Sequence, residues 1–359
     1  MVGIAITHAL RSRADQPPAT EVAAAVALPE TGRDKAEVPA DAMTITPEGR
    51  KAIDRGLVWL LGAMNSHGQF GGDIGYPPDL SCTAMAGLAL LAEGNTPHGG
   101  RHMRELQLVT DAVLTMVERL PTGPRKGEEI VLIQRKIGVN ADRFFAALFL
   151  SEVLGEAGDS DAEIRVALNK LVTDICAAQG TDGTWGNESW APILGTVMGW
   201  ECLRSSASGG LKVEASAQLA GKALLEKLKS TVNEQESWMH DFYKNASSIR
   251  VLYSMGYRNE PAYHAALKKT IRFAWEDRPF IEAGGEEFLG FFLVTECLLQ
   301  DEAQWGPQWY PTVQRKLVRV QNTDGSWTGH HCIVSRTFCT AAAVMTIQAP
   351  RQCLAMSNF

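Results

Sequence analysis

The segment Gln321-Asn322-Thr323-Asp324-Gly325-Ser326-Trp327-Thr328-Gly329-His330-His331-Cys332 is a turn between two helical patterns. Apolar residues recur at helical spacing before it, over 313–320, and after it, over 333–347. Turns favour Asn, Asp and Gly, because Asn and Asp cap the backbone locally and Gly accepts a positive φ. We expect the large apolar side chain of Trp327 to anchor this turn on the body of the protein.

The same pattern occurs twice more along the chain. Residues 179–186 read Gln-Gly-Thr-Asp-Gly-Thr-Trp-Gly and follow a helical run over 167–178. Residues 65–72 read Asn-Ser-His-Gly-Gln-Phe-Gly-Gly, with Phe70 in the aromatic position, and follow an amphipathic run over 52–64. A helix, a polar turn and a second helix thus repeat, which predicts a stack of helical hairpins that forms either a solenoid or a closed ring.

The composition suits a globular protein with a large core, since 45% of the 359 residues are hydrophobic and 21% are charged. The formal net charge is −7 and the sequence pI is about 5.7, which argues against a nucleic-acid partner. Lys and Arg are scattered, so no polybasic run is present to attract an anionic membrane. No apolar run approaches the roughly 18 residues of a membrane-spanning helix, and none is predicted.

The first part of the chain differs from the rest. Residues 1–45 are rich in Ala, Pro, Thr, Glu and Asp, and they predict a flexible or extended N-terminal arm that a protein partner could bind. Residues 46–359 form the predicted helical domain. The stretch Met1–Leu10 is apolar but short and lacks an early basic region, so it is a poor signal peptide. This favours a cytoplasmic protein, with an exported form left open.

Two kinds of helix alternate after residue 46. Amphipathic patterns, which suit an outer position with one wet face, lie at 47–64, 101–119, 160–178, 213–232, 260–277 and 309–321. Apolar patterns, which suit an inner position, lie at 81–93, 140–155, 189–205, 241–256, 285–300 and 334–348. The sequence therefore predicts an all-α protein, an α6/α6 toroid of about six helical hairpins. An open solenoid is the alternative, but its last helix would need a polar outer face, and 334–348 is apolar.

At this point a family resemblance can be stated. The two Gln-x-x-Asp-Gly-x-Trp segments, Gln179–Trp185 and Gln321–Trp327, resemble the repeats of the squalene cyclase and protein prenyltransferase superfamily. The resemblance covers about 46–350 and implies the α/α toroid of that superfamily. It also implies cyclisation of polyprenes or prenyl transfer to Cys, or, in relatives that share only the barrel, lanthionine formation or thioester chemistry.

The signatures of these activities are missing. The Asp-x-Asp-Asp run of the cyclases, whose central acid protonates an alkene, does not occur, and Asp159-Ser160-Asp161 is the nearest match. The Asp-x-Cys pair with which prenyltransferases hold zinc and the Cys-Gly-Glu-Gln of the thioester relatives are also absent. The resemblance thus predicts the fold and leaves the activity open.

In a toroid of this kind, the first turns of the inner helices and the loops before them line the central cavity. His330, His331 and Cys332 place two imidazoles and a thiol in one such loop, and zinc or copper is the ion that these donors suit. Adjacent residues rarely all bind one ion, so a further ligand such as His240, Asp241 or Cys82 would be needed. The alternative is a capping loop with one buried, hydrogen-bonded His.

Two further groups suit acid–base chemistry. His240 beside Asp241 could act as a general base with Tyr243 as the acid, although Asp241 also suits an N-cap. Glu286 and Glu287 open an inner helix; a carboxyl there that faces a low-dielectric cavity would have a raised pKa and could act as an acid. Stabilisation of the helix start by these carboxylates is the alternative.

The remaining candidates concern the lining of the cavity. Asp142 completes the candidate catalytic set, although with Arg143 it also suits an ion pair that braces the ring. Aromatic residues on the inner helices could bind an isoprenoid and stabilise a carbocation through cation–π contacts, or they could fill an ordinary core. The candidate ligand-contacting residues are Cys82, Trp190, Phe288 and Arg336.

The seven cysteines show no disulfide framework and predict reduced, buried thiols. Cys332 and Cys339 would lie about 10 Å apart by helical rise, too far for a bridge unless the helix begins after Cys332.

Three functional hypotheses follow from these observations. The first is a terpenoid cyclase- or prenyltransferase-like enzyme that binds an apolar isoprenoid molecule in a central cavity, with a metal near His330–Cys332. The second is a non-catalytic scaffold that binds another protein through the toroid surface or the arm. The third is a carbohydrate-active toroid, because glycosidases also use paired carboxylates.

Overall fold

The computed structural model describes residues 43–123, 131–230, 238–299 and 305–357. The side chains of residues 230, 238–241 and 352–357 also lie outside the description. The predicted arm at 1–45 therefore lies outside the described residues except for 43–45, and its proposed role stays a prediction.

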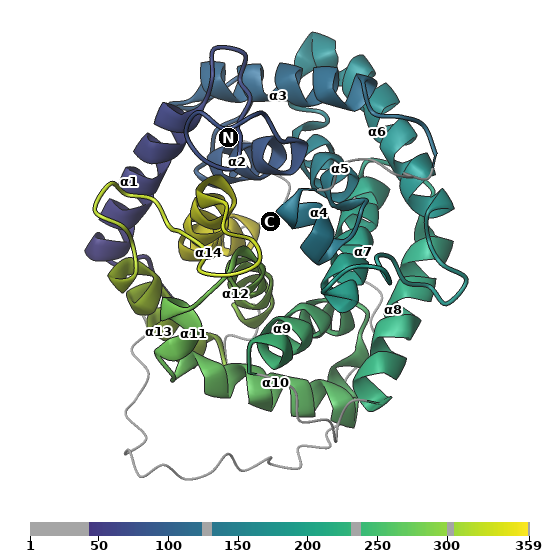
Figure 1. Cartoon of the computed structure of the whole chain (residues 1–359), viewed down its shortest axis with the longest axis vertical. Helices are drawn as coiled ribbons and strands as arrows, with labels where there is room; N and C mark the ends of the chain where they lie inside the picture. The colour runs from purple at the N-terminus through teal and green to yellow at the C-terminus, as the bar shows by residue number, and fades with distance from the viewer. Residues whose placement is uncertain (1–42, 124–130, 231–237, 300–304, 358–359) are drawn as a thin grey trace.

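Helices alternate between two concentric rings (Figure 1). The outer ring consists of α1 (Pro47–Ala63), α3 (Met103–Glu118), α6 (Asp161–Ala177), α8 (Glu214–Ser230), α10 (Pro261–Ala274) and α13 (Gly306–Arg319). The inner ring consists of α2 (Leu80–Ala92), α5 (Ala141–Val153), α7 (Pro192–Ser208), α9 (Trp238–Ser254), α12 (Gly285–Leu298) and α14 (Arg336–Ser357). The predicted all-α architecture of six hairpins is confirmed. Two short helices were not predicted: α4 (Leu132–Ile137) and α11 (Arg278–Ile281).

The rings are closed. Each inner helix packs against the next, and the last one, α14, packs against α2. The first outer helix, α1, likewise packs against both α13 and α14. The open solenoid is therefore wrong, and the apolar last helix is covered because it lies beside the first hairpin.

Burial follows the division into rings. Every residue of α2 and of α12 is buried, as expected for helices that are surrounded by others. Outer helices bury one face only; in α1 this face includes Ile53, Leu57 and Leu60. Among the described helices, none combines the length and the apolarity that crossing a bilayer requires.

The repeated turns are built alike. The indole N–H groups of Trp185 and Trp327 donate to the carbonyls of Ile175 and Leu317, each at 2.8 Å. These bonds tie each turn to the outer helix that precedes it. The backbone N–H of each aromatic residue also donates to a threonine hydroxyl on the following inner helix: Phe70 to Thr83, Trp185 to Thr196 and Trp327 to Thr340.

A glycine in each turn presses against the next outer helix. Gly183 has a φ of 85°, and a Cβ on it would lie 2.6 Å from the carbonyl oxygen of Leu219 on α8. Gly325 has a φ of 98°, and its Cβ would lie 2.6 Å from the carbonyl oxygen of Arg55 on α1. Only glycine fits both the positive φ and the close approach. The last turn thus packs on the first outer helix, and the repeated motif itself closes the ring.

Candidate functional site

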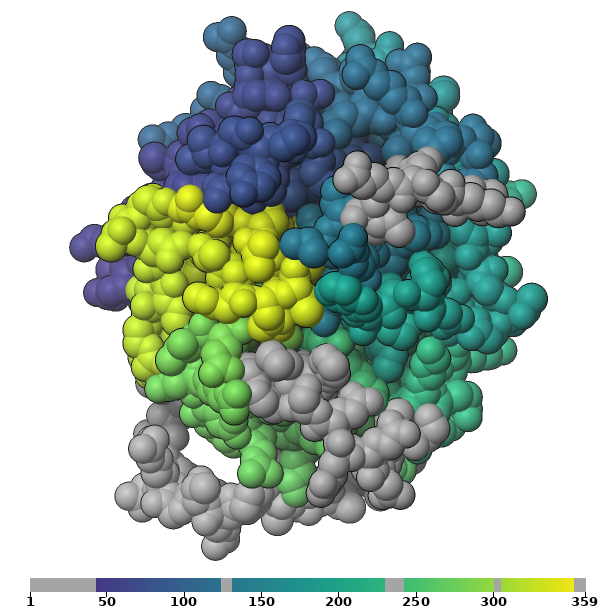
Figure 2. Space-filling view, viewed as in Figure 1, coloured from purple at the N-terminus to yellow at the C-terminus, as the bar shows by residue number. Residues whose placement is uncertain are grey.

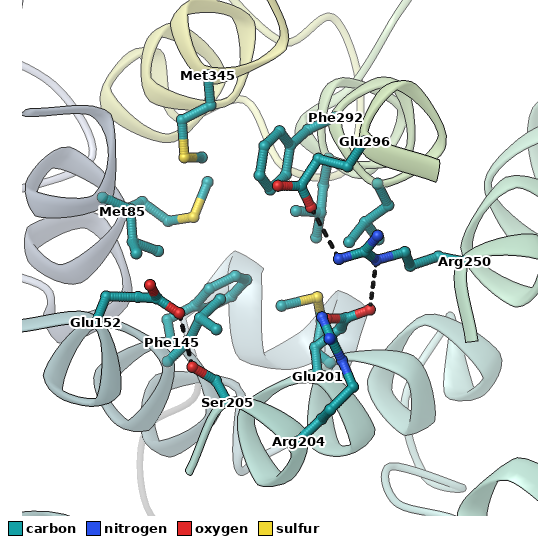
Figure 3. A pocket seen from close by; sticks show the side chains of 15 residues that line it. Met85, Phe145, Glu152, Glu201, Arg204, Ser205, Arg250, Phe292, Glu296 and Met345 are labelled. Carbon is teal, nitrogen blue, oxygen red and sulfur yellow. Dashed lines mark hydrogen bonds and ion pairs between the residues drawn. The ribbon is translucent and has the colours of Figure 1, made fainter. Parts of the chain in front are cut away.

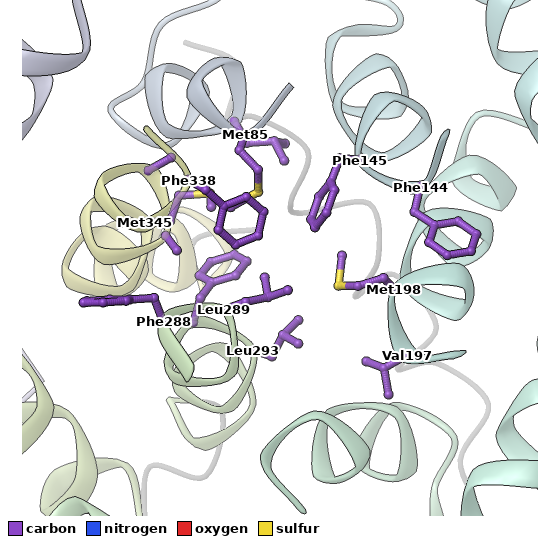
Figure 4. Close-up of a cluster of buried hydrophobic side chains, with 14 of the residues drawn as sticks. Met85, Phe144, Phe145, Val197, Met198, Phe288, Leu289, Leu293, Phe338 and Met345 are labelled. Atoms are coloured by element: carbon purple, nitrogen blue, oxygen red, sulfur yellow. The ribbon is translucent and has the colours of Figure 1, made fainter. Parts of the chain in front are cut away.

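The axis of the ring is filled by apolar side chains. Met85, Met198 and Met345, which we call the methionine belt, lie around it together with Phe145 and Phe338 (Figure 4). The two phenylalanine rings meet edge to face, with centroids 5.3 Å apart. The belt and these rings form an apolar plug between two polar clusters.

The first polar cluster lies where α4, the first turns of α9 and α12, and the α13–α14 loop meet. We call it the α4 cluster, and its members are Lys136, Tyr243, Glu286, Glu287, His331 and Cys332. Figure 2 shows the coloured atoms of α4 and of the α13–α14 region closing over the middle of this face. The carboxylates are fully buried, and His331 is only 24% exposed.

The imidazole of His331 bridges the two carboxylates. Its Nδ1 lies 3.3 Å from Glu286 Oε1, and its Nε2 lies 3.2 Å from Glu287 Oε2. Glu286 Oε1 also lies 3.0 Å from Lys136 Nζ. Glu287 Oε2 accepts from the backbone N–H of Gly284 at 2.7 Å, whereas its Oε1 is buried without a hydrogen-bond partner among the described residues. Glu287 therefore caps its helix and keeps one free oxygen.

This arrangement separates the pKa values of the two carboxyl groups. Glu286 and then Glu287 raise the pKa of His331 to about 11, so the imidazole is protonated at neutral pH. Burial alone would raise the pKa of Glu286, but His331 and Lys136 outweigh it and lower this pKa below its ordinary value. Burial raises the pKa of Glu287 to about 7, and the charge of Glu286 adds to the effect. Glu286 is thus the ionised partner, and Glu287 is an acid that titrates near neutral pH.

Lys136 completes the cluster from α4. Its Nζ lies 4.6 Å from the centroid of the Tyr243 ring and 3.5 Å from Cys332 Sγ. Burial alone would lower the pKa of Lys136, but the Glu286 carboxylate outweighs it and the pKa rises. Burial also raises the pKa of Tyr243 to about 12, although the charge of Lys136 opposes this shift.

Cys332 is the one non-glycine residue with a positive φ, 45°, in the described part of the chain. Such strained residues concentrate at functional sites.

Two of the three predicted metal ligands, His331 and Cys332, come together with Glu286, and a metal at this place stays a prediction. Ligand atoms of Glu286, His331 and Cys332 all lie within 4.8 Å of one another, and a carboxylate, an imidazole and a thiolate suit zinc. However, the Lys136 ammonium contacts both Glu286 and Cys332, so a cationic group already takes the place of the ion. His330, predicted as a ligand, has an exposed side chain and does not join the group, because its backbone N–H is tied to the carbonyl of Ala283.

The other predicted residues are placed as follows. Cys82 is buried at the same end of the axis, with its Sγ 3.4 Å from Ser335 Oγ, and burial raises the pKa of this thiol well above its ordinary value. Asp142 is buried at the start of α5 and accepts from the backbone N–H of Arg143. The guanidinium of Arg143 instead faces Asp174 at 3.7 Å, so this is the ion pair that braces the ring.

Three predicted ligand contacts need correction. Trp190 is 53% exposed and lies under the Arg135 guanidinium, because α7 begins only at Pro192 and leaves Trp190 in the preceding loop. Arg336 pairs with Asp324 and Asp73 and covers the Trp59 ring, so it braces the repeat turn.

Phe288 is the third of these residues. It is buried but does not line the axial cavity, and its ring meets that of Phe291 edge to face.

His240 and Asp241 lie in the first turn of α9, and their side chains are outside the description. Their predicted general-base role therefore stays a prediction.

The sequence reasoning missed Lys136 because it missed α4. The signal that could have identified this segment is the pair Ile133 and Ile137 at helical spacing around Gln-Arg-Lys, which predicts one turn of helix with an apolar face.

The second polar cluster lies at the opposite end of the plug, on the later turns of four inner helices (Figure 3). We call it the far cluster, and its members are Glu152, Glu201, Arg204, Ser205, Arg250 and Glu296. Arg250 Nε lies 3.0 Å from Glu201 Oε1, and Arg250 Nη2 lies 3.2 Å from Glu296 Oε2. Arg204 also pairs with Glu201, at 2.9 Å.

A cavity separates the far cluster from the methionine belt. Its volume is about 30 Å³, which is room for about two water molecules. The expected ligand-sized cavity with aromatic walls is therefore filled in this structure, because the belt and the Phe145 and Phe292 side chains occupy the axis.

The comparisons with known proteins agree with this architecture. The structure resembles that of the apo type II terpene cyclase MstE from Scytonema, with a TM-score of 0.54 and 14% sequence identity over 84% of this chain and 98% of that chain. It equally resembles the GH76A alpha-1,6-mannanase from Salegentibacter sp. HEL1_6, with a TM-score of 0.54 and 11% identity over 85% of this chain and 99% of that chain. The chain is an α/α toroid.

A variant of MstE in complex with merosterolic acid A (product) is also similar, with a TM-score of 0.51 and 16% identity over 85% of this chain and 98% of that chain. No protein-family model and no curated protein sequence matches the chain. At such low identity, these similarities concern the toroid fold, which is the fold that the resemblance of its repeats implied.

Proposed function

We propose that this toroid is an acid–base enzyme of the terpenoid cyclase type, in which Glu287 donates a proton to an apolar isoprenoid substrate. The observation that carries the proposal is the Glu286–His331–Glu287 arrangement, buried at one end of an apolar axis. The Asp-x-Asp-Asp acid of the cyclases is absent, and Glu287 would take its role.

The chemistry requires a neutral carboxylic acid near an apolar wall. Protonation of an alkene forms a C–H bond from the π-electron pair and leaves a carbocation and the Glu287 carboxylate. His331, which is protonated, would offset the new negative charge on Glu287. The Phe145 and Phe338 rings could stabilise the cation. Loss of a proton from carbon to the carboxylate would return Glu287 to its acid form.

The substrate class rests on the composition of the axis. Thioether side chains are flexible and fill irregular space, so the methionine belt can rearrange around an apolar chain. The known complex of the similar cyclase MstE with its product supports such a ligand. A carbohydrate substrate is less well supported, because the axis between the clusters offers apolar rather than hydrogen-bonding side chains.

The test is turnover of an isoprenoid panel, including geranylgeraniol and squalene, by the full-length protein, with products identified by mass spectrometry. Glu287→Gln should lower the initial rate about 100-fold or more, because a positioned general acid contributes on the order of 10²–10⁴. The exposed Glu163→Gln on α6 is the matched control and should keep the wild-type rate. An unchanged rate in Glu287→Gln, or no turnover of any compound by the wild type, would refute the proposal.

A non-catalytic scaffold is the second candidate, and the observation that favours it is the filled axis. In that case Glu287 has a structural role only: it accepts from the backbone N–H of Gly284 and contacts His331, so Glu287→Leu should lower the free energy of unfolding. Absence of isoprenoid binding by the wild type, together with a destabilised Glu287→Leu variant, would favour the scaffold.

A further inference from the structure

One buried acid in the far cluster has an unused oxygen. Glu152 is 2% exposed, and its Oε1 accepts from Ser205 Oγ at 2.7 Å. Its Oε2 is buried without a hydrogen-bond partner among the described residues. Figure 3 shows the carboxyl group of Glu152 directed toward the middle of the cavity. A buried oxygen without a hydrogen bond costs free energy, so we expect a bound molecule to provide the hydrogen-bond partner of Oε2.

The neighbouring arginines form ion pairs with carboxylates other than Glu152. Arg250 is divided between Glu201 and Glu296, and Arg204 pairs with Glu201. No ion pair with Glu152 occurs within the described residues. Burial therefore raises the pKa of Glu152 to about 8, although the hydrogen bond from Ser205 opposes the shift. At neutral pH the carboxyl group is mainly protonated, and Oε2 is the oxygen that remains open to a hydrogen-bond partner in either protonation state.

A hydroxyl group fits this site best. It can accept from the protonated Oε2 and can donate to the ionised one, so it satisfies Glu152 in both states. Its size suits a cavity of about 30 Å³. The charges around the cavity are already paired, Arg250 with Glu201 and Glu296 and Arg204 with Glu201, so a ligand ammonium group would find no unpaired carboxylate while Glu152 is neutral.

The rest of the cavity wall indicates what bears the hydroxyl. Met85, Leu88 and Met345 line the cavity, and the apolar plug continues from there toward the α4 cluster. Along α12, ten residues separate Glu286 from Glu296, which is about 15 Å of helical rise. The axis thus joins an acid at one end to a hydroxyl-sized polar cavity at the other.

We propose that Glu152 and Ser205 bind the hydroxyl group of an elongated apolar alcohol, whose chain runs through the methionine belt toward Glu287. This inference rests on the proposed function for the apolar chain, and it narrows the substrate class from isoprenoids to isoprenoid alcohols. Glu152 is then a residue that orients the substrate.

The test compares farnesol with the hydrocarbon farnesene, both delivered from the same cyclodextrin carrier to the full-length protein, by equilibrium dialysis. The wild type should bind farnesol about tenfold more tightly than farnesene, because the alcohol satisfies a buried carboxyl group. Glu152→Met keeps the length of the side chain and removes its oxygens, and it should abolish this preference while still binding both compounds. Glu152→Gln, which retains hydrogen bonding, should keep most of the preference.

The control is Ser151→Ala on the same helix. Ser151 is buried and bonds to Ala147 and Ser206, but it does not line the cavity, so its removal should leave the preference unchanged. Equal binding of farnesol and farnesene by the wild type would overturn the inference and would mean that Glu152 bonds to water only; the proposed function would stand. Failure of the wild type to bind either compound would refute the apolar substrate, and this inference with it.

Discussion

The two polar clusters at the ends of the axis are built differently. The α4 cluster takes its side chains from a short helix, a loop and the first turns of two inner helices. The far cluster takes all of its side chains from the later turns of α5, α7, α9 and α12. Loops carried on a rigid scaffold are the usual place for catalytic groups, and the strained backbone of Cys332 belongs to the α4 cluster. The difference supports chemistry at the α4 end and binding at the other.

The clusters nevertheless share one feature. Each contains a carboxyl group whose pKa is raised by burial although cations lie nearby: Glu287 at the α4 end and Glu152 at the far end. In the α4 cluster the protonated His331 contacts that carboxyl group, whereas in the far cluster only a hydroxyl group does. Burial raises both pKa values, and neither the imidazolium nor the hydroxyl cancels that effect, so burial is the main control on a carboxyl group at the centre of the ring.

Removing Arg250 should have the largest effect on stability. In Arg250→Met, Glu201 keeps its ion pair with Arg204, and Glu296 loses its ion pair with Arg250. Because both carboxylates are buried, the free energy of unfolding should fall by about 3–5 kcal/mol. Urea unfolding measures the change. Arg204→Met is the control; its side chain is 16% exposed and Glu201 would keep Arg250, so the loss should be clearly smaller. Equal losses would show that the far cluster is not centred on Arg250.

Removing Lys136 should turn the α4 cluster into a metal site. In Lys136→Ala, the ammonium group no longer opposes a cation near Glu286, His331 and Cys332, and zinc should bind about tenfold or more tightly than to the wild type. Competition titration and elemental analysis measure the affinity and the stoichiometry. In the Lys136→Ala background, His331→Ala and Cys332→Ala should lose the metal and His330→Ala should retain it. No gain of zinc would contradict the role given to Lys136.

Straining the last repeat turn should disturb one cluster only. Gly325→Ala places a Cβ against the carbonyl of Arg55 at a positive φ and should cost about 1–3 kcal/mol. Because His331 belongs to the same loop, its NMR titration should shift, while the Glu152 carboxyl resonance should not. The exposed Gly62→Ala, where a Cβ meets nothing within 4 Å, should stabilise α1 by about 0.5–1 kcal/mol. A shift of both resonances would mean that the two ends are coupled.

The two clusters should also respond differently to pH. Glu152 has a pKa raised from 4.5 to about 8, so the folded state holds a proton that the unfolded state has lost, and stability should decline as pH rises through that window. His331 has a pKa raised from 6.5 to about 11, and its contribution, complete below the lower value, should disappear as pH rises through the higher one.

Thermal unfolding of Glu152→Gln and His331→Gln across pH 5–10 tests both assignments. The first variant should show a smaller decline on the acid side of this range, where Glu287 still contributes because its pKa is raised to about 7. The second should lack the decline on the alkaline side. The groups that face Glu152 are Glu201, Glu296 and Arg204, and those that face His331 are Glu286, Glu287 and Cys332. Identical pH profiles for the two variants would contradict the assignments.

The helices and their arrangement in a ring could be predicted from the amino-acid sequence. Amphipathic and apolar patterns alternate along the chain, and most predicted helix ends lie within a few residues of the observed ones. This is because the spacing of apolar residues within a helix shows which of its faces is buried. Closure was predicted from the apolar pattern of 334–348, which the end of an open array would leave exposed. Glu286, Glu287, His331, Cys332 and Tyr243 could be named from their positions near inner helix starts.

The contacts among these residues could not be predicted, because they depend on the folded arrangement of the helices. Lys136 and Glu286 are distant in the sequence but form an ion pair. The far cluster combines side chains from four helices, and the periodicity of each helix does not determine how the helices are rotated relative to one another. The exposure of Trp190 depended on where α7 begins, and the filling of the axis depended on the summed volumes of side chains from the inner helices. Periodicity is a property of neighbours along the chain, whereas contacts across the ring arise only once it has closed.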